Sequence, residues 1–142
     1  MEVSILVNSR KLEDLHPKVK VLAERFIASC AKQNIDVIIT STYRDAESQN
    51  ALYAQGRTLP GSKVTNAKGG QSFHNWRVAF DFVPVVNGKA QWNDIALFTK
   101  CGEIGESLGL EWAGRWTKFK EYAHLQYTNG LKLADFQEGK TI

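Results

Sequence analysis

Residues 71–82 read QSFHNWRVAFDF, and this stretch decides how the rest of the chain is interpreted. Val78, Phe80 and Phe82 alternate with Asp81 and its small neighbours, and this period of two predicts a buried strand with side chains on both faces. Asp81 would then point into an apolar layer. A buried carboxylate without a partner is costly or takes up a proton, so Asp81 needs a cation or several hydrogen-bond donors. A metal ion is the simplest such partner.

The histidines support this interpretation. The chain has three, of which His74 lies in the opening stretch and His124 in a later one that reads EYAHLQY. Two imidazoles and one carboxylate, with a position left open, are typical of a catalytic zinc site, whereas structural sites usually use four ligands and several cysteines. We therefore predict Zn²⁺ held by His74, Asp81 and His124. Glu121 would lie near the metal without ligating it, as a general base toward water requires.

The remaining pattern predicts one domain over residues 1–142, an α+β fold with a small antiparallel sheet flanked by helices. Asn87-Gly88 between extended segments is a strong hairpin signal and makes the sheet antiparallel. Gly102 and Gly105 indicate close packing of their helix against another backbone. Apolar spacing and a β-branched run mark the expected elements, which are helices over residues 12–33, 46–55 and 94–108 and a strand over residues 36–40.

Residues 57–70 are rich in glycine and polar residues and predict a loop that leads to the rim of a cleft. At the end of this loop Gln71 is a candidate substrate contact, and Ser72 is a candidate for orienting the metal ligands. Both are equally well interpreted as structural loop residues. His16 lies at the entry of the first helix, where we expect it to cap the helix or lie at the surface.

Two groups of residues leave alternatives open. Cys30 and Cys101 have no metal-binding or redox spacing, so we interpret them as small buried hydrophobes, with a disulfide between them as the alternative. The aromatic residues near the end of the chain are interpreted equally well as core or as cleft wall. These are Trp112, Trp116, Phe119 and Tyr122.

Composition and charge exclude several classes of protein. Hydrophobic residues make up 43% of the chain and charged residues 23%, as in a soluble globular protein. No apolar run approaches the length of a membrane span, and no cluster of basic and aromatic residues indicates a nucleic-acid groove. The net charge of +3 serves solubility or affinity for an anionic polymer. We expect a monomer with no nucleic-acid partner and no stable membrane association.

The motifs resemble the zinc D,D-carboxypeptidase and L-alanyl-D-glutamate endopeptidase family, which includes bacteriophage endolysins and vancomycin-resistance dipeptidases. The resemblance extends over about residues 12–126. Its ordered motifs are SxYR at 41–44 with Gln49, LYAQGR at 52–57, SxHxxxxAxD at 72–81, GLEW at 109–112 and ExxH at 121–124. The resemblance implies the fold that this peptidase family has in common with Hedgehog signalling domains. It also implies that His74, Asp81 and His124 bind zinc and that Glu121 is the catalytic base.

The resemblance also implies a reaction. Arg44 would face the scissile bond and stabilise charge on the carbonyl oxygen, and Gln49 would contact substrate. From the residues alone, an arginine at a strand-to-helix junction is more often solvated or paired with a carboxylate. The implied function is a peptidoglycan hydrolase that cuts the stem peptide between L-Ala and D-Glu. A D-alanyl-D-alanine carboxypeptidase or dipeptidase, and a non-catalytic zinc-binding module, are the alternatives.

Three positions depart from the family pattern. Arg77 stands where glycine is usual, Arg115 stands where an acid is usual, and Glu121 stands where the endopeptidase branch more often has aspartate. We expect Arg77 and Arg115 at the cleft rim, where they would meet the D-Glu carboxylate.

The chain begins MEVSILVN, without the basic and long apolar segments of a secretory signal. We therefore expect synthesis in the cytoplasm without a signal peptide. The resemblance implies that the protein then acts on the cell wall after release by a separate holin-like protein.

Overall fold

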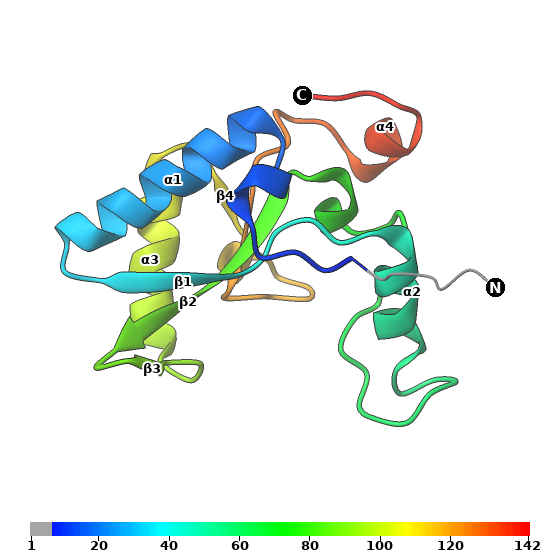
Figure 1. Cartoon of the computed structure of the whole chain (residues 1–142), viewed down its shortest axis with the longest axis horizontal. Helices are drawn as coiled ribbons and strands as arrows, with labels where there is room; N and C mark the ends of the chain where they lie inside the picture. Colours follow the sequence, from blue (N-terminus) through cyan, green and yellow to red (C-terminus); the bar gives the residue numbers. More distant parts are fainter. Residues whose placement is uncertain (1–6) are drawn as a thin grey trace.

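The computed structural model describes residues 7–142, which combine one antiparallel sheet with helices on one face of it (Figure 1). The start of the chain, on which the expectation of no secretory signal rests, lies outside the described residues. Within residues 7–142, no helix has the length and apolar character needed to cross a bilayer.

The sheet has the antiparallel pairing that the sequence predicts. Its strands follow the order β1, β2, β5, β4, and β3 pairs with the outer end of β2. The turn between β2 and β3 is made by Asn87 and Gly88, both in the left-handed region with φ of 52° and 77°, which confirms the predicted hairpin. The strands are β1 (Asp36–Ser41), β2 (Ala79–Val86), β3 (Lys89–Ala90), β4 (Glu111–Trp112) and β5 (His124–Gln126).

Within residues 7–142, four α-helices accompany the sheet. They are α1 (Pro17–Lys32), α2 (Ala46–Ala54), α3 (Ile95–Ser107) and α4 (Leu133–Gln137), with 3-10 turns at Leu12–Asp14, Phe73–Trp76 and Ala113–Arg115. The predicted helix over residues 12–33 is wrong at its start, because Pro17 disfavours helical geometry at His16 and separates the first 3-10 turn from α1. His16 caps α1, with its Nδ1 accepting the Lys18 amide at 3.1 Å, which confirms the predicted cap.

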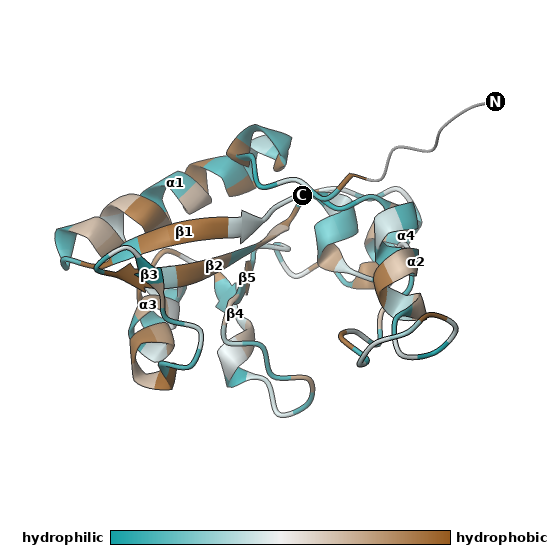
Figure 2. Cartoon of the chain, turned by 60° about the horizontal axis from the view of Figure 1, so that its bottom comes forward, coloured by the Kyte–Doolittle hydropathy of each residue, from teal (hydrophilic) through white to brown (hydrophobic). Residues whose placement is uncertain are grey.

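One face of the sheet carries the core. The ring of Phe26 on α1 lies 4.9 Å from that of Phe82 on β2, and the ring of Phe98 on α3 lies 5.5 Å from Phe82 on the same face. Figure 2 shows β1 and the outer part of β2 largely in brown, and α1 with alternating brown and teal segments, as expected of a helix with one apolar face. Cys30 and Cys101 are buried in this layer as free thiols.

The opposite face of β2 carries Asp81, and here one expectation is wrong. Because residues alternate along the strand, the Phe80 and Phe82 face is apolar and Asp81 faces a cleft, with 26% of its side chain exposed. The glycines of α3 also differ from the prediction in what they meet. Gly102 packs against the indole of Trp112 and Gly105 against Leu125, so their close contacts are side chains and not backbone.

Candidate metal centre and substrate cleft

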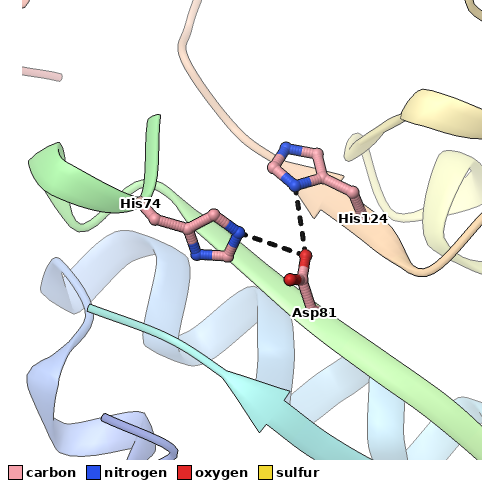
Figure 3. A group of neighbouring side chains, drawn as sticks. All are labelled: His74, Asp81 and His124. Atoms are coloured by element: carbon pink, nitrogen blue, oxygen red, sulfur yellow. Dashed lines mark hydrogen bonds and ion pairs between the residues drawn. The ribbon is translucent and has the colours of Figure 1, made fainter. Parts of the chain in front are cut away.

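Three side chains converge on the floor of the cleft (Figure 3). His74 comes from the 3-10 turn before β2, Asp81 from the middle of β2 and His124 from the start of β5. The pairing of β2 with β5 sets Asp81 directly opposite His124. His74 Nε2 and His124 Nδ1 each lie 3.1 Å from the same oxygen of Asp81. The three candidate ligand atoms are within 4.8 Å of one another.

His74 is held in one tautomer by the backbone. Its Nδ1 lies 2.8 Å from the carbonyl oxygen of Thr42. Since a carbonyl only accepts, Nδ1 carries the proton and Nε2 presents its lone pair toward Asp81.

His124 is oriented through a chain of hydrogen bonds. Its Nε2 lies 2.8 Å from Oε1 of Gln126, whose amide nitrogen donates to Glu111 at 3.2 Å, and the Glu111 carboxylate also accepts from the indole of Trp116 at 3.0 Å. A carboxylate accepts only, so the Gln126 nitrogen faces Glu111 and its oxygen faces His124. Nε2 of His124 therefore carries the proton, and the Nδ1 lone pair faces Asp81.

Two lone pairs and one carboxylate oxygen thus face a common point, an arrangement that requires a cation. In the metal-free site that cation is a proton. Burial opposes the charge on Asp81, but the two histidines outweigh it and hold the pKa of Asp81 well below its usual range. Burial likewise disfavours the charge on His124, but the hydrogen bond and charge of Asp81 outweigh it and raise the pKa of His124. The donor set fits a divalent metal, which would replace that proton.

Glu121 lies beside this point without joining it. Its carboxylate is 3.6 Å from Nδ1 of His124, and 55% of its side chain is exposed to the cleft. Its backbone N–H donates to the carbonyl of Ala113 at 3.2 Å, which fixes the start of the segment that leads to His124. Glu121 is therefore open to both water and substrate.

Arg44 and Gln49 form one unit at the side of the cleft. Arg44 Nη1 donates to Gln49 Oε1 at 2.9 Å and Nη2 to the Ser41 hydroxyl at 3.2 Å, whereas Nε is buried without a partner in the described part of the chain. Burial lowers the pKa of Arg44, against the opposing charges of Asp81 and Glu121. Gln49 is only 1% exposed, and its amide nitrogen donates to the Ala67 carbonyl at 2.8 Å.

Gln71 and Ser72 lie where the loop reaches the floor. The Ser72 hydroxyl accepts the backbone N–H of His74 at 3.3 Å and so caps the turn that carries this histidine. Gln71 lines the cleft, and its side-chain oxygen accepts the amide of Lys68 at 2.9 Å.

The cleft is a single cavity of about 1150 Å³, and all eight predicted site residues line it. The aromatic residues divide between the two interpretations. Trp112 is 2% exposed and belongs to the core, whereas Trp116, Phe119 and Tyr122 line the cleft. Sequence reasoning missed the part of the wall that α4 provides, because the tail carries no motif. It also missed Gln126, although the period of two along β5 places Gln126 on the same face as His124.

The expectation for Arg77 and Arg115 is wrong, since neither lines the cleft. Arg77 stacks over the ring of Tyr43 at 3.8 Å and donates to the carbonyl of Asp14. Arg115 pairs with Glu106 on α3 at 3.0 Å. Each guanidinium is thus held by a partner outside the cleft.

Comparison with known proteins agrees with this geometry. A profile of a family described as D-alanyl-D-alanine carboxypeptidase matches residues 65–127, which hold all three candidate metal ligands. Among curated proteins, the peptidoglycan L-alanyl-D-glutamate endopeptidase CwlK of Bacillus subtilis is 40% identical over 128 residues, covering 80% of this chain and 73% of that protein.

Solved structures of low sequence identity share the fold. The L-Ala D-Glu endopeptidase ChiX of Serratia marcescens superposes with a TM-score of 0.60 at 18% identity, covering 88% of this chain and 86% of that chain. The vancomycin-resistance D,D-pentapeptidase VanY in complex with Zn(II) superposes with a TM-score of 0.60 at 13% identity, covering 87% and 76%. The likeness confirms the predicted α+β fold. The identity to CwlK shows that the chain belongs to the D-alanyl-D-alanine carboxypeptidase and L-alanyl-D-glutamate endopeptidase family of metallopeptidases.

Proposed function

We propose that this protein is a zinc-dependent peptidoglycan hydrolase that cuts the stem peptide between L-Ala and D-Glu. The observation that carries the proposal is the convergence of two histidine lone pairs and the Asp81 carboxylate beside the exposed carboxylate of Glu121. The 40% identity to an L-alanyl-D-glutamate endopeptidase supports the choice of bond. We further propose that residues 1–142 form one domain that acts as a monomer, without stable membrane association.

In this proposal His74 Nε2, Asp81 and His124 Nδ1 hold the metal. Nitrogen and carboxylate ligands without sulfur suit a catalytic zinc ion, and the Zn(II) complex of the structural neighbour VanY supports the same choice. When bound, the ion supplies a Lewis acid that polarises the scissile carbonyl and makes water more acidic. Thr42 and Gln126 keep both imidazoles in the tautomer that ligation needs.

Glu121 acts as the general base and acid. Its carboxylate takes the proton from the attacking water and delivers it to the nitrogen of the departing D-Glu residue, so that the amide bond breaks without release of a free amide anion. Its exposure to the cleft and its place 3.6 Å from His124 suit both transfers. The extra methylene of Glu121 relative to aspartate extends the reach of the base.

Arg44 stabilises the charge that develops on the carbonyl oxygen. One N–H of Nη1 and one of Nη2 are bound to Gln49 and Ser41, which orient the guanidinium and leave the second hydrogen of each nitrogen for substrate. Gln49 then serves substrate binding indirectly, because its oxygen holds Arg44 and its nitrogen holds the loop at Ala67. We propose that Gln71 contacts the substrate and that Ser72 orients His74.

A D-alanyl-D-alanine carboxypeptidase is the second candidate, favoured by the family profile over residues 65–127. Digestion of purified tetrapeptide and pentapeptide muropeptides, followed by mass spectrometry, separates the two. The endopeptidase releases L-Ala-bearing sugar and a peptide that begins with D-Glu from both substrates. Removal of only the terminal D-Ala from the pentapeptide would show that the carboxypeptidase assignment is correct.

A further inference from the structure

The wall of the cleft carries two lysine side chains that have no role in the proposed chemistry. Among the described residues, its wall has three basic side chains, Arg44, Lys63 and Lys120. Arg44 is held at the floor by Gln49 and Ser41. Lys120 is exposed, and within residues 7–142 no carboxylate lies within ion-pair distance of it. An unpaired ammonium on a cleft wall is available to an anionic substrate group.

The backbone that follows Lys120 is held at two successive residues. Glu121, the next residue, donates its N–H to the Ala113 carbonyl at 3.2 Å, and the Tyr122 carbonyl accepts the indole N–H of Trp112 at 2.8 Å. The ammonium of Lys120 lies 5.9 Å from the centroid of the Tyr122 ring, another part of the cleft wall. Lys120 is therefore anchored one residue from the proposed base, with adjacent Cα atoms about 3.8 Å apart.

The substrate of the proposed reaction has a carboxylate that would lie near Lys120 and Glu121. A glutamate residue has two carboxyl groups beyond its amine, and the peptide continues through one of them. The other is free unless it is amidated, and it belongs to the residue whose nitrogen leaves during cleavage. The free carboxylate is only a few covalent bonds from that nitrogen. Because Glu121 delivers a proton to the same nitrogen, the carboxylate must lie close to Glu121.

We infer that Lys120 binds the free carboxylate of the D-Glu residue and makes the enzyme prefer D-Glu over its amide. The inference rests on the proposed function and assigns it a specificity-determining residue. Lys63 also lines the cleft, but within residues 7–142 no hydrogen bond or ion pair joins it to Glu121 or His124, whereas Lys120 is the direct neighbour of Glu121. Lys120 is therefore the better placed of the two.

The test compares two stem peptides that differ only in the free carboxyl group of the D-Glu residue, carboxylate in one and amide in the other. The wild-type enzyme should cleave the carboxylate form with a kcat/KM about two- to fivefold higher, as expected for one solvent-accessible ion pair. The ratio should fall to near one in Lys120→Gln and be largely kept in Lys120→Arg, which retains the charge. It should also shrink as salt is raised from about 0.05 M to about 0.5 M.

Lys118→Gln is the matched control, because Lys118 is exposed two residues away and does not line the cleft. Its ratio should equal that of the wild type. Equal cleavage of both peptides by the wild type, or an unchanged ratio in Lys120→Gln, would overturn the inference and leave the proposed function standing. Loss of the ratio in Lys63→Gln alone would also overturn it. If neither peptide is cut at this bond, the proposed function fails and this inference fails with it.

Discussion

The floor and the rim of the cleft are built in opposite ways. On the floor, His74 and His124 are 4% and 5% exposed, and the second nitrogen of each ring is bound to an acceptor within the chain. On the rim, Phe119 is 69% exposed and Val64 55%, and both lie in loops. The floor is therefore arranged before substrate arrives, whereas the rim offers exposed side chains on loops. Chemistry depends on the first region and the choice of substrate on the second.

The largest expected effect comes from removing a ligand on the floor. His124→Ala or His74→Ala should abolish stoichiometric metal binding and lower hydrolysis at least about a thousandfold, because two ligands do not hold a catalytic zinc. Elemental analysis and a muropeptide assay measure the two losses. His16→Ala is the control, since His16 caps α1 and has no place in the cleft. A full complement of zinc in His124→Ala would show that the floor is misassigned.

The next effect separates proton transfer from metal binding. Glu121→Gln should retain the metal and the fold but lose about a hundredfold or more in kcat, because the amide accepts no proton from water. Glu103→Gln, an exposed change on α3, should leave kcat unaltered. Near-normal turnover of Glu121→Gln would place the base elsewhere in the cleft.

A smaller effect tests whether the support beneath the floor matters. Gln126→Leu removes the acceptor of the His124 Nε2 proton and leaves Glu111 with one partner fewer, so metal affinity should weaken about 10- to 100-fold. Competition with a chelator of known affinity measures this change. Gln33→Leu, at the exposed C-terminal end of α1, is the control. Unchanged affinity in Gln126→Leu would mean that the strands alone orient His124.

The smallest effect is the pH dependence of the metal-free floor. The pKa of His124 is raised from 6.5, so its stabilisation is complete below 6.5 and is lost as pH rises through the folded-state pKa. The pKa of Asp81 is lowered from 3.8, so its stabilisation is present above 3.8 and is lost as pH falls through the folded-state pKa. The contribution of the pair is therefore fullest between these two pH values.

Thermal unfolding measures this contribution. Taking about 2 kcal/mol for a hydrogen bond to a charged group, the metal-free wild type should gain about 6 °C in Tm over Asp81→Asn at pH 5, and less at pH 8. In the presence of metal, the Tm difference between wild type and Asp81→Asn should instead be larger at pH 8 than at pH 5. The reason is that metal binding requires histidine to lose its proton. A Tm difference from Asp81→Asn that is larger at pH 8 without metal would contradict the assignment.

The floor was largely predictable from the sequence, and the rim was not. His74, Asp81 and Glu121 with His124 stand in short motifs whose spacing follows from local geometry, a turn before a strand and one strand paired with the next. Their roles remain predictions, but the structure brings them together as expected.

Arg77 illustrates why the rim was missed. It has a φ of 65°, in the left-handed region that favours the glycine usual at this position, and its side chain is directed onto Tyr43. Arg115 is drawn to Glu106 on α3. Both outcomes depend on partners brought close only by the folded chain, which no local pattern contains. The same holds for α4, whose Phe136 packs on Phe73.

The packing of Trp112 links the far side of the sheet to the reaction. A methyl group on Gly102 would come within 2.2 Å of this indole, and one on Gly114 within 2.1 Å, while the indole N–H holds the Tyr122 carbonyl between Glu121 and His124. Displacing the ring would therefore disturb the base and a metal ligand together without touching either. Gly102→Ala should thus give a temperature-sensitive form, in which the displaced indole no longer holds the segment between Glu121 and His124.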